Sequence, residues 1–249
     1  GVERATGDYI GFVDSDDFID SEMYEKLYIA IKKEDVDVAE CNLKIIYPDR
    51  VELFTEKDYY NVCSKQEYLE EYLKIENIFG SACVRLIKSD IAKKIKFPIG
   101  KLYEDTYYAY DLIEKVDRYV IMNNPYYNYF MRENSITNAK FNPRIFDLIE
   151  IVNKFHTRVY EEYYSLKEAA DCRKMYAYFS VLNSMLLEEK FKNNSYYPLV
   201  MNYFKENYKE LLKNKYISRN RKLSILLIKM NINLYKKVLM KYKAVLAGN

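Results

Sequence analysis

The fold class is indicated by residues 7–17, which read GDYIGFVDSDD. Residues 9–13 form a short apolar run between a glycine-aspartate pair and an acidic cluster, a pattern that predicts a buried strand. Three carboxylates, those of Asp14, Asp16 and Asp17, follow the apolar run directly. In open α/β folds, ligands bind beyond the carboxyl ends of the strands. We therefore expect a ligand site immediately after this strand.

The acidic cluster indicates a divalent metal ion. Neighbouring carboxylates repel one another unless a cation neutralises them. Mg²⁺ or Mn²⁺ is commonly held by one or two protein carboxylates, with substrate phosphates completing its coordination. The cluster therefore predicts Mg²⁺ or Mn²⁺ and a phosphorylated substrate. A solvated acidic turn and a helix cap remain alternatives, because a short acidic motif matches many sequences by chance.

A calcium-binding loop is a third alternative for the same segment. Asp14, Asp16, Asp20 and Glu25 fall at the first, third, seventh and twelfth positions of an EF-hand loop. The sixth position requires glycine but is Ile19, and a predicted strand replaces the entering helix. These differences argue against an EF-hand.

A second acidic pair, Glu104 and Asp105, stands at the start of a predicted helix at 103–116, after the sequence FPIGKLY. The positive end of the helix dipole favours ionised carboxylates in the first turn. An ionised carboxylate there suits the removal of a proton from a substrate hydroxyl. Simple capping of the helix by acidic residues is the alternative.

The first part of the chain contains short predicted elements. A strand is predicted at 36–47, and extended segments at 119–122 and 126–130 flank an Asn-Asn-Pro turn. Ser21 is expected to cap a helix, and Ser64 with Glu67 forms a capping box for another. The predicted helices of this part cover residues 21–33, 64–75, 89–95 and 103–116.

After residue 143 the pattern changes to long helices with little turn chemistry between them. These helices are predicted at 144–164, 167–190, 198–213 and 219–243. We expect an α/β region at 1–140 followed by an all-α region at 141–249.

Composition excludes several classes of protein. The chain has 249 residues, a formal net charge of +2 and 49% hydrophobic residues, as expected for a packed globular protein. No uncharged run exceeds residues 119–131, which is too short to span a bilayer. Four cysteines without a C-x-x-C pair and a single histidine, His156, argue against zinc sites and disulfide frameworks. Reduced, buried thiols and a packed or surface-exposed His156 are expected.

The basic residues concentrate near the C-terminus. Residues 201–249 contain 12 Lys and Arg but only 2 Asp and Glu. Lysines recur every seven residues from Lys215 to Lys243, which on one helix would form a basic stripe. Such a helix, spanning 215–243, could bind an anionic membrane surface or pack on its own domain with its lysines in solvent. No recognition motif accompanies this charge, so nucleic acid is not expected as a partner.

Three blocks together resemble glycosyltransferase family 2. They are residues 1–17, the Phe97-Pro98 pair with Tyr103-Glu104-Asp105, and residues 125–136, which read PYYNYFMRENSI. Their order and spacing match the family, and the resemblance covers roughly residues 1–137. Three motifs in register are more specific than any one of them. The resemblance implies a Rossmann-like GT-A fold and an inverting transfer of sugar from a nucleotide-diphosphate sugar.

The resemblance also implies roles for individual residues. Asp14 to Asp16 corresponds to the family's D-x-D motif, in which Asp16 would bind the metal and Asp14 would contact the ribose or the metal through water. Asp17 would position these two carboxylates without binding the metal itself. Asp105 would be the general base that deprotonates the acceptor hydroxyl, with Glu104 beside it.

Two further site residues follow from the same resemblance. Arg132 and Ser135 would lie on a closing loop, where the guanidinium could bind diphosphate oxygens in a bidentate manner. In the block at 82–86, relatives commonly carry an aromatic residue and a lysine, whereas this chain has Arg85 before Leu86.

The resemblance further implies where the protein acts. Family members open with an apolar strand and an acidic turn that hold the nucleotide base, whereas this chain begins just before the D-x-D strand. We expect an N-terminally truncated GT-A domain that binds nucleotide sugar weakly alone. The expected acceptor is a saccharide or a lipid-linked saccharide in cell-surface polysaccharide synthesis, at the cytoplasmic face of the membrane. A noncatalytic relative that binds sugar or serves as a scaffold is the alternative.

Overall fold

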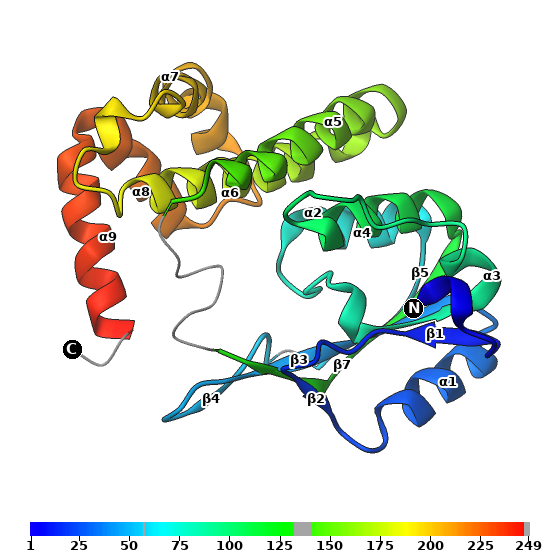
Figure 1. Ribbon diagram of the computed structural model, residues 1–249. Helices are drawn as coiled ribbons and strands as arrows, with labels where there is room; N and C mark the ends of the chain where they lie inside the picture. Colours follow the sequence, from blue (N-terminus) through cyan, green and yellow to red (C-terminus); the bar gives the residue numbers. More distant parts are fainter. Residues whose placement is uncertain (57, 132–140, 247–249) are drawn as a thin grey trace. The chain divides into compact units, whose positions relative to one another are not determined.

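The computed structural model describes the backbone of residues 1–56, 58–131 and 141–246. The chain forms two compact units, Gly1–Asn138 and Ala139–Asn249. The first unit combines a sheet with helices, and the second is helical (Figure 1). The predicted order of an α/β region followed by an all-α region is therefore confirmed.

A sheet of seven strands forms the centre of the described part of the first unit. Its strand order is β1-β6-β3-β7-β2, with β4 beside β3 and β5 beside β7. β3 and β7 are parallel, and the other pairs are antiparallel. The strands are β1 (Tyr9–Gly11), β2 (Phe18–Ile19), β3 (Val38–Ile46), β4 (Val51–Leu53), β5 (Tyr60–Ser64), β6 (Arg85–Lys88) and β7 (Arg118–Phe130).

Helices cover both faces of this sheet. Figure 1 shows α1 (Met23–Glu34) on one face and α2 (Lys65–Lys74) and α4 (Glu104–Lys115) on the other. Helix α1 buries Met23, Leu27 and Ile31 against the sheet, because residues four apart share one helix face. Full burial of each such side chain contributes roughly 1.5–3 kcal/mol. The shorter helical segments are η1 (Val2–Arg4), η2 (Ala82–Val84) and α3 (Ser89–Ala92).

Several predicted elements are confirmed, including the strand now seen as β3. The capping box of α2 is present, with Ser64 and Glu67 bonding reciprocally. The prediction of a Ser21 cap is wrong: the N-cap of α1 is Glu22, without a side-chain bond. The backbone N–H of Met23 bonds instead to the carbonyl of Asp20.

The strand predicted at 9–13 is shorter than expected. β1 ends at Gly11, pairs only with β6 among the described strands, and buries only Ile10. The ring of Tyr24 occupies the space where a side chain at Gly11 would lie, so α1 packs directly on the strand backbone. Strands β2, β4, β5 and β6 were not predicted, because two to five residues carry too little periodicity to distinguish them from loops.

β7 is one continuous strand, whereas the sequence predicted two segments separated by a turn. The irregularity falls where Pro125 faces Asn42, and the register of β3 and β7 shifts on both sides of Asn42. Proline lacks an N–H group and is therefore tolerated at a bulge. The Asn42 amide donates to the Asn123 side chain at 2.8 Å, which satisfies polar groups that the bulge would otherwise leave unpaired.

The second unit packs helices that are neighbours in sequence, such as α5 with α6 and α8 with α9. Buried apolar residues on each helix form its core. Its helices are α5 (Phe146–Glu162), α6 (Lys167–Met185), α7 (Tyr197–Lys213), α8 (Arg219–Met230) and α9 (Ile232–Leu246), with short turns η4 (Pro143–Ile145), η5 (Tyr164–Leu166) and η6 (Phe191–Asn193).

The prediction of a single helix at 219–243 is wrong, because this segment forms two helices, α8 and α9. Asn231 separates α8 from α9, because its side chain accepts hydrogen bonds from the backbone of Asn233 and Leu234. The break interrupts the predicted lysine stripe. Lys229 lies 3.3 Å from the centre of the Tyr208 ring, and Lys236 donates to the carbonyl of Glu188.

The cysteines and the histidine are structural, as predicted. All four cysteines are free and buried. His156 lies on α5, and its Nε2 is 2.8 Å from the Asp171 carboxylate on α6. No helix of the described chain has the length and apolar character needed to cross a membrane.

Candidate active site

A cavity of about 230 Å³ opens in the first unit beside the acidic cluster. Three carboxylates line it: those of Asp14 and Asp17, which follow β1, and that of Asp105, in the first turn of α4. The rest of the wall is supplied by residues of β3, β7 and the segment around η2, namely Leu43, Phe79, Ser81, Cys83, Val84, Tyr127 and Tyr129. The fold therefore brings together acidic groups that lie some ninety residues apart in the sequence.

Tyr127 of β7 holds the loop that carries the acidic cluster. Its hydroxyl accepts a hydrogen bond from the backbone N–H of Asp14 at 3.2 Å and donates to Asp17 Oδ2 at 2.7 Å. The other Asp17 oxygen accepts from the backbone N–H of Phe130 at 2.9 Å. Burial raises the pKa of Tyr127 well above its ordinary value, so its hydroxyl remains protonated and able to donate.

Asp20 anchors the far end of the same loop. Its carboxylate accepts from Lys44 at 2.9 Å and from Asn128 at 2.8 Å, which lie on β3 and β7. These two hydrogen bonds lower the pKa of Asp20. The loop is thus attached to the sheet at both ends and is preorganised for binding.

Asp105 reaches the cavity from the opposite side. Its Oδ2 accepts a hydrogen bond from the Ser81 hydroxyl at 2.6 Å. Ser81 Oγ in turn accepts from the backbone N–H of Cys83. Tyr103, directly before α4, adopts a left-handed conformation with φ of 60°. Such backbone strain in a non-glycine residue is commonly retained at functional sites.

The pKa of Asp14 is raised by its surroundings in the site. Burial against the cavity wall raises its pKa, although part of its side chain remains exposed to solvent. A hydrogen bond from Cys83 opposes that effect, and the neighbouring carboxylates of Asp105, Asp17 and Asp16 raise the pKa further. Negative charge therefore accumulates where a cation would relieve it.

A buried charged pair contacts the segment that carries the wall residue Ser81. Arg85 Nε donates to Glu40 Oε2 at 2.8 Å, and 0% and 1% of these side chains are exposed. Tyr68 joins them, since its hydroxyl accepts from Arg85 Nη2 and donates to Glu40. Burial alone would lower the pKa of Arg85, but the Glu40 carboxylate raises it above its ordinary value. Arg85 is therefore part of the core and is not placed to contact an acceptor.

The same pair orients one wall of the cavity. Glu40 Oε1 accepts from the backbone N–H of Gly80 at 3.3 Å, directly before Ser81. Gly80 has φ of +81°, and the Tyr72 ring lies where a side chain would stand. A glycine is required there for both reasons. The network thus connects the core to the serine that binds Asp105.

Some of the predicted site residues line the cavity and others do not. Asp14, Asp17 and Asp105 lie together on the cavity wall. Asp16 and Glu104 are exposed and are not among the wall residues. The roles assigned to Asp16 and Glu104 stay predictions.

The predicted closing-loop residues, Arg132 and Ser135, lie outside the described residues.

Sequence reasoning did not identify Ser81, Cys83 and Tyr127 as site residues. Tyr127 was part of the motif at 125–136, but its contacts with residues more than a hundred positions away leave no local trace. Ser81 is followed by an apolar segment and carries no recognisable spacing. Only the fold reveals that both residues orient the acidic groups.

The donor set fits a divalent ion only in part. Among the described residues, no group of three or more His, Cys, Asp or Glu could hold a metal by itself. Mg²⁺ is commonly bound by one or two carboxylates plus substrate phosphates. The charge accumulated at Asp14 fits that kind of incomplete site.

Comparison with known families finds a match within the first unit. The family model Glycosyl transferase family 2 matches residues 1–96. The chain is 30% identical over 148 residues to Glycosyltransferase GlyA of Streptococcus pneumoniae serotype 4, covering 55% of this chain and 21% of that protein. It is 27% identical over 169 residues to Glycosyltransferase GlyG of the same organism, covering 62% and 54%. The chain thus spans only part of these relatives.

Solved structures share the fold. Staphylococcus aureus TarS 1-349, in complex with UDP-GlcNAc, matches with a TM-score of 0.61 at 15% identity, covering 98% of this chain and 70% of that one. Similarity at this identity concerns the fold alone. It agrees with the GT-A fold expected for the first unit.

Proposed function

We propose that this protein transfers a sugar from a nucleotide-diphosphate sugar to a hydroxyl of a saccharide or lipid-linked acceptor, because residues 1–96 match the model of glycosyltransferase family 2. One observation carries the proposal. Carboxylates from the β1 loop and from α4, namely Asp14, Asp17 and Asp105, line a single cavity. A phosphorylated donor needs a cation at one side of such a site, and an acceptor needs a base at the other.

Asp105 is the proposed general base. Ser81 holds one of its oxygens at 2.6 Å, which fixes the carboxylate and leaves its second oxygen for the acceptor hydroxyl. That hydroxyl loses its proton to Asp105 and its oxygen bonds to the anomeric carbon. The bond from that carbon to the diphosphate oxygen breaks in the same displacement, which inverts the configuration.

Asp14 and Asp16 are the proposed ligands of Mg²⁺ or Mn²⁺, and Asp17 is proposed to orient their loop and contact the donor. The metal, when bound, stabilises the negative charge of the departing diphosphate. Tyr127 supports this arrangement by fixing Asp14 and Asp17 through one hydroxyl. Glu104 is proposed as an acceptor contact, and Arg132 and Ser135 as donor contacts.

The test is a sugar-transfer and donor-hydrolysis assay with Mn²⁺, using UDP-GlcNAc as the first donor because the TarS structure contains it. Asp105→Asn should lower turnover by about 10²–10⁴-fold while donor binding in calorimetry is retained. Asp16→Ala should weaken both. Asp111→Asn, at an exposed position further along α4, is the matched control and should change neither. Full turnover by Asp105→Asn would exclude Asp105 as the base.

We also propose that the protein acts in cell-surface polysaccharide synthesis at the cytoplasmic face of the membrane, with residues 215–243 as the contact. Exposed apolar side chains on α8 and α9 support the proposal: Leu223, Met230, Leu234, Val238 and Tyr242. No acidic residue follows Glu210, so an anionic surface is favoured. Co-sedimentation with vesicles should therefore require anionic lipid, and equal binding to neutral vesicles would contradict this location.

A further inference from the structure

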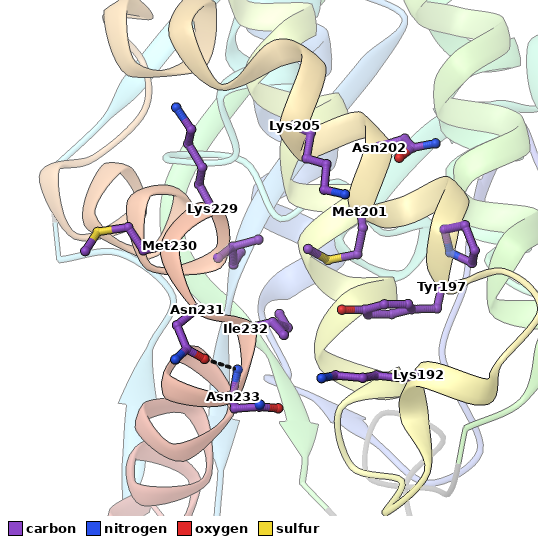
Figure 2. A pocket seen from close by; sticks show the side chains of 12 residues that line it. Lys192, Tyr197, Met201, Asn202, Lys205, Lys229, Met230, Asn231, Ile232 and Asn233 are labelled. Carbon is purple, nitrogen blue, oxygen red and sulfur yellow. Dashed lines mark hydrogen bonds between the residues drawn. The ribbon is translucent and has the colours of Figure 1, made fainter.

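A second cavity lies in the helical unit and has no part in the proposed sugar transfer. It has a volume of about 450 Å³ and is formed by η6, α7 and the junction between α8 and α9 (Figure 2). This size is within the range of small-molecule sites. The cavity exists because Asn231 breaks the helix predicted at 219–243: a continuous helix would remove the wall formed by the junction.

The junction is a rigid part of this wall. Asn231 Oδ1 accepts from the backbone N–H groups of Asn233 and Leu234 at 3.0 and 3.2 Å. The first of these bonds is drawn in Figure 2. Because the Asn231 side chain already accepts hydrogen bonds from these N–H groups, they are not free to bind a ligand in the cavity. Recognition must come from the side chains around the cavity.

The floor of the cavity is apolar. Met201 and Ile228 are 8% and 2% exposed, and Ile232 is half-buried beside them. Figure 2 shows Tyr197 with its ring beside Met201 and its hydroxyl directed toward the junction. Burial raises the pKa of Tyr197, so its hydroxyl is a donor at neutral pH. Packed apolar groups with a few polar groups at the edge are typical of ligand sites.

The rim is cationic. Lys192 of η6 and Lys205 of α7 line the cavity, and among its twelve lining residues there is no Asp or Glu. Neither lysine forms an ion pair with a carboxylate in the described part of the chain. Lys229 is different, because its ammonium group lies on the Tyr208 ring and points away from Met201 and Tyr197 in Figure 2. Lys192 has only a distant ring contact, 5.9 Å from the centre of Phe191, so Lys192 and Lys205 are both available to an anion.

We propose that this cavity binds the phosphate group of a ligand whose remaining part packs on the Tyr197 and Met201 floor. A phosphate monoester carries about −1.5 to −2 charges at pH 7, which matches two ammonium groups better than a single carboxylate does. Lysine acts as a point charge toward phosphate, and the Tyr197 hydroxyl supplies a neutral donor at the same rim. The proposal does not depend on the sugar-transfer activity of the first unit.

The test uses inorganic pyrophosphate, titrated into the full 249-residue chain at constant ionic strength and followed by calorimetry and amide chemical shifts. Shifts should concentrate at residues 192–205 and 228–233. Lys192→Ala and Lys205→Ala should each weaken binding by about tenfold, as expected for loss of one charge-assisted hydrogen bond. Lys209→Ala, an exposed lysine of α7 outside both the cavity and residues 215–243, is the matched control and should leave affinity unchanged.

A vesicle arm distinguishes two sources of the phosphate. If binding to vesicles that contain phosphatidic acid, a phosphate monoester, depends on Lys192 and Lys205 while pyrophosphate does not bind, the ligand is a lipid headgroup. If pyrophosphate binding alone depends on them, the ligand is a soluble phosphate compound. Either result supports the site. Absence of both interactions, or equal weakening by Lys209→Ala, overturns it, since the effect would then be absent or due to net charge.

Discussion

The deepest side chains of the two units differ in kind. In the first unit, Glu40 and Arg85 lie at the centre of the sheet with almost none of their surface exposed. In the second, the fully buried side chains of α6 include Val181, Leu182 and Met185, which are apolar. Of the seven buried polar residues described, six belong to the first unit and one, Asn214, to the second.

The difference shows what the polar core of the first unit accomplishes. Burying charge is costly, and replacement of a buried ion pair by apolar residues is often neutral or stabilising. Glu40 nevertheless accepts a hydrogen bond from the backbone of Gly80, and the next residue, Ser81, donates to Asp105. The second unit has an apolar core and keeps nearly all its charges at the surface. We therefore infer that the buried charges of the first unit serve to orient Ser81 and Asp105, and not to increase the stability of the unit.

The largest expected effect comes from breaking the buried pair. Glu40→Gln should destabilise the first unit by about 3–5 kcal/mol, because it leaves Arg85 charged in the core without its partner. Chemical denaturation followed by tyrosine fluorescence measures the loss. Glu40→Leu combined with Arg85→Met should recover most of the stability but not the geometry of Ser81. Equal losses for the single and double variants would contradict the proposed role of unpaired charge.

Truncation of a buried apolar side chain in the second unit can be compared with the loss of a buried charge in the first. Leu182→Ala should destabilise that unit by about 2–5 kcal/mol through lost burial and a residual cavity. This loss should be the same at pH 5 and pH 8, because no titratable group changes its contacts. Leu199→Ala, at an exposed position of α7, should cost less than about 0.5 kcal/mol. A pH-dependent loss for Leu182→Ala would show that the two cores are less distinct than their composition suggests.

Removal of one hydroxyl tests how the acidic loop is held. Tyr127→Phe should cost about 1–3 kcal/mol, because Asp17 Oδ2 and the backbone of Asp14 lose their shared partner. Ligand binding at the cavity should weaken in parallel. Tyr196→Phe, an exposed tyrosine of the second unit, is the control and should have no measurable effect. Unchanged stability in both variants would mean that the loop is held by other contacts.

The smallest expected effect concerns Asp20 and pH. Its folded-state pKa is lowered by Lys44 and Asn128, so its contribution is present above its unfolded pKa of about 3.9 and is lost as pH falls through the lower folded value. Asp20→Asn should therefore destabilise by roughly 0.5–1 kcal/mol at pH 7, with the difference disappearing in acid. Unfolding titrations from pH 7 to pH 2 measure it. Asp49→Asn, at an exposed carboxylate, should show a smaller difference throughout.

Local signals in the sequence predicted much of the fold. The capping box at Ser64 and the β-branched run of β3 were recognisable because each depends on neighbouring residues. The break at Asn231 was not, since a helical pattern continues across it, and the asparagine cap that begins α9 acts together with the tertiary contacts of Lys229 and Lys236. The continuity of β7 through Pro125 was missed for the same reason: its bulge is satisfied by Asn42 from another strand.

The sequence by itself determined the class of each unit, the free state of the cysteines and the identity of the acidic residues, because these follow from periodicity, spacing and composition. Tertiary structure alone decided that Asp14 and Asp105 share a cavity, and that Arg85 belongs to the core. It also decided that Lys192 and Lys205 border a second cavity. Each of these facts joins residues distant in sequence, and such contacts arise only when burial and hydrogen bonding across the whole fold are satisfied together.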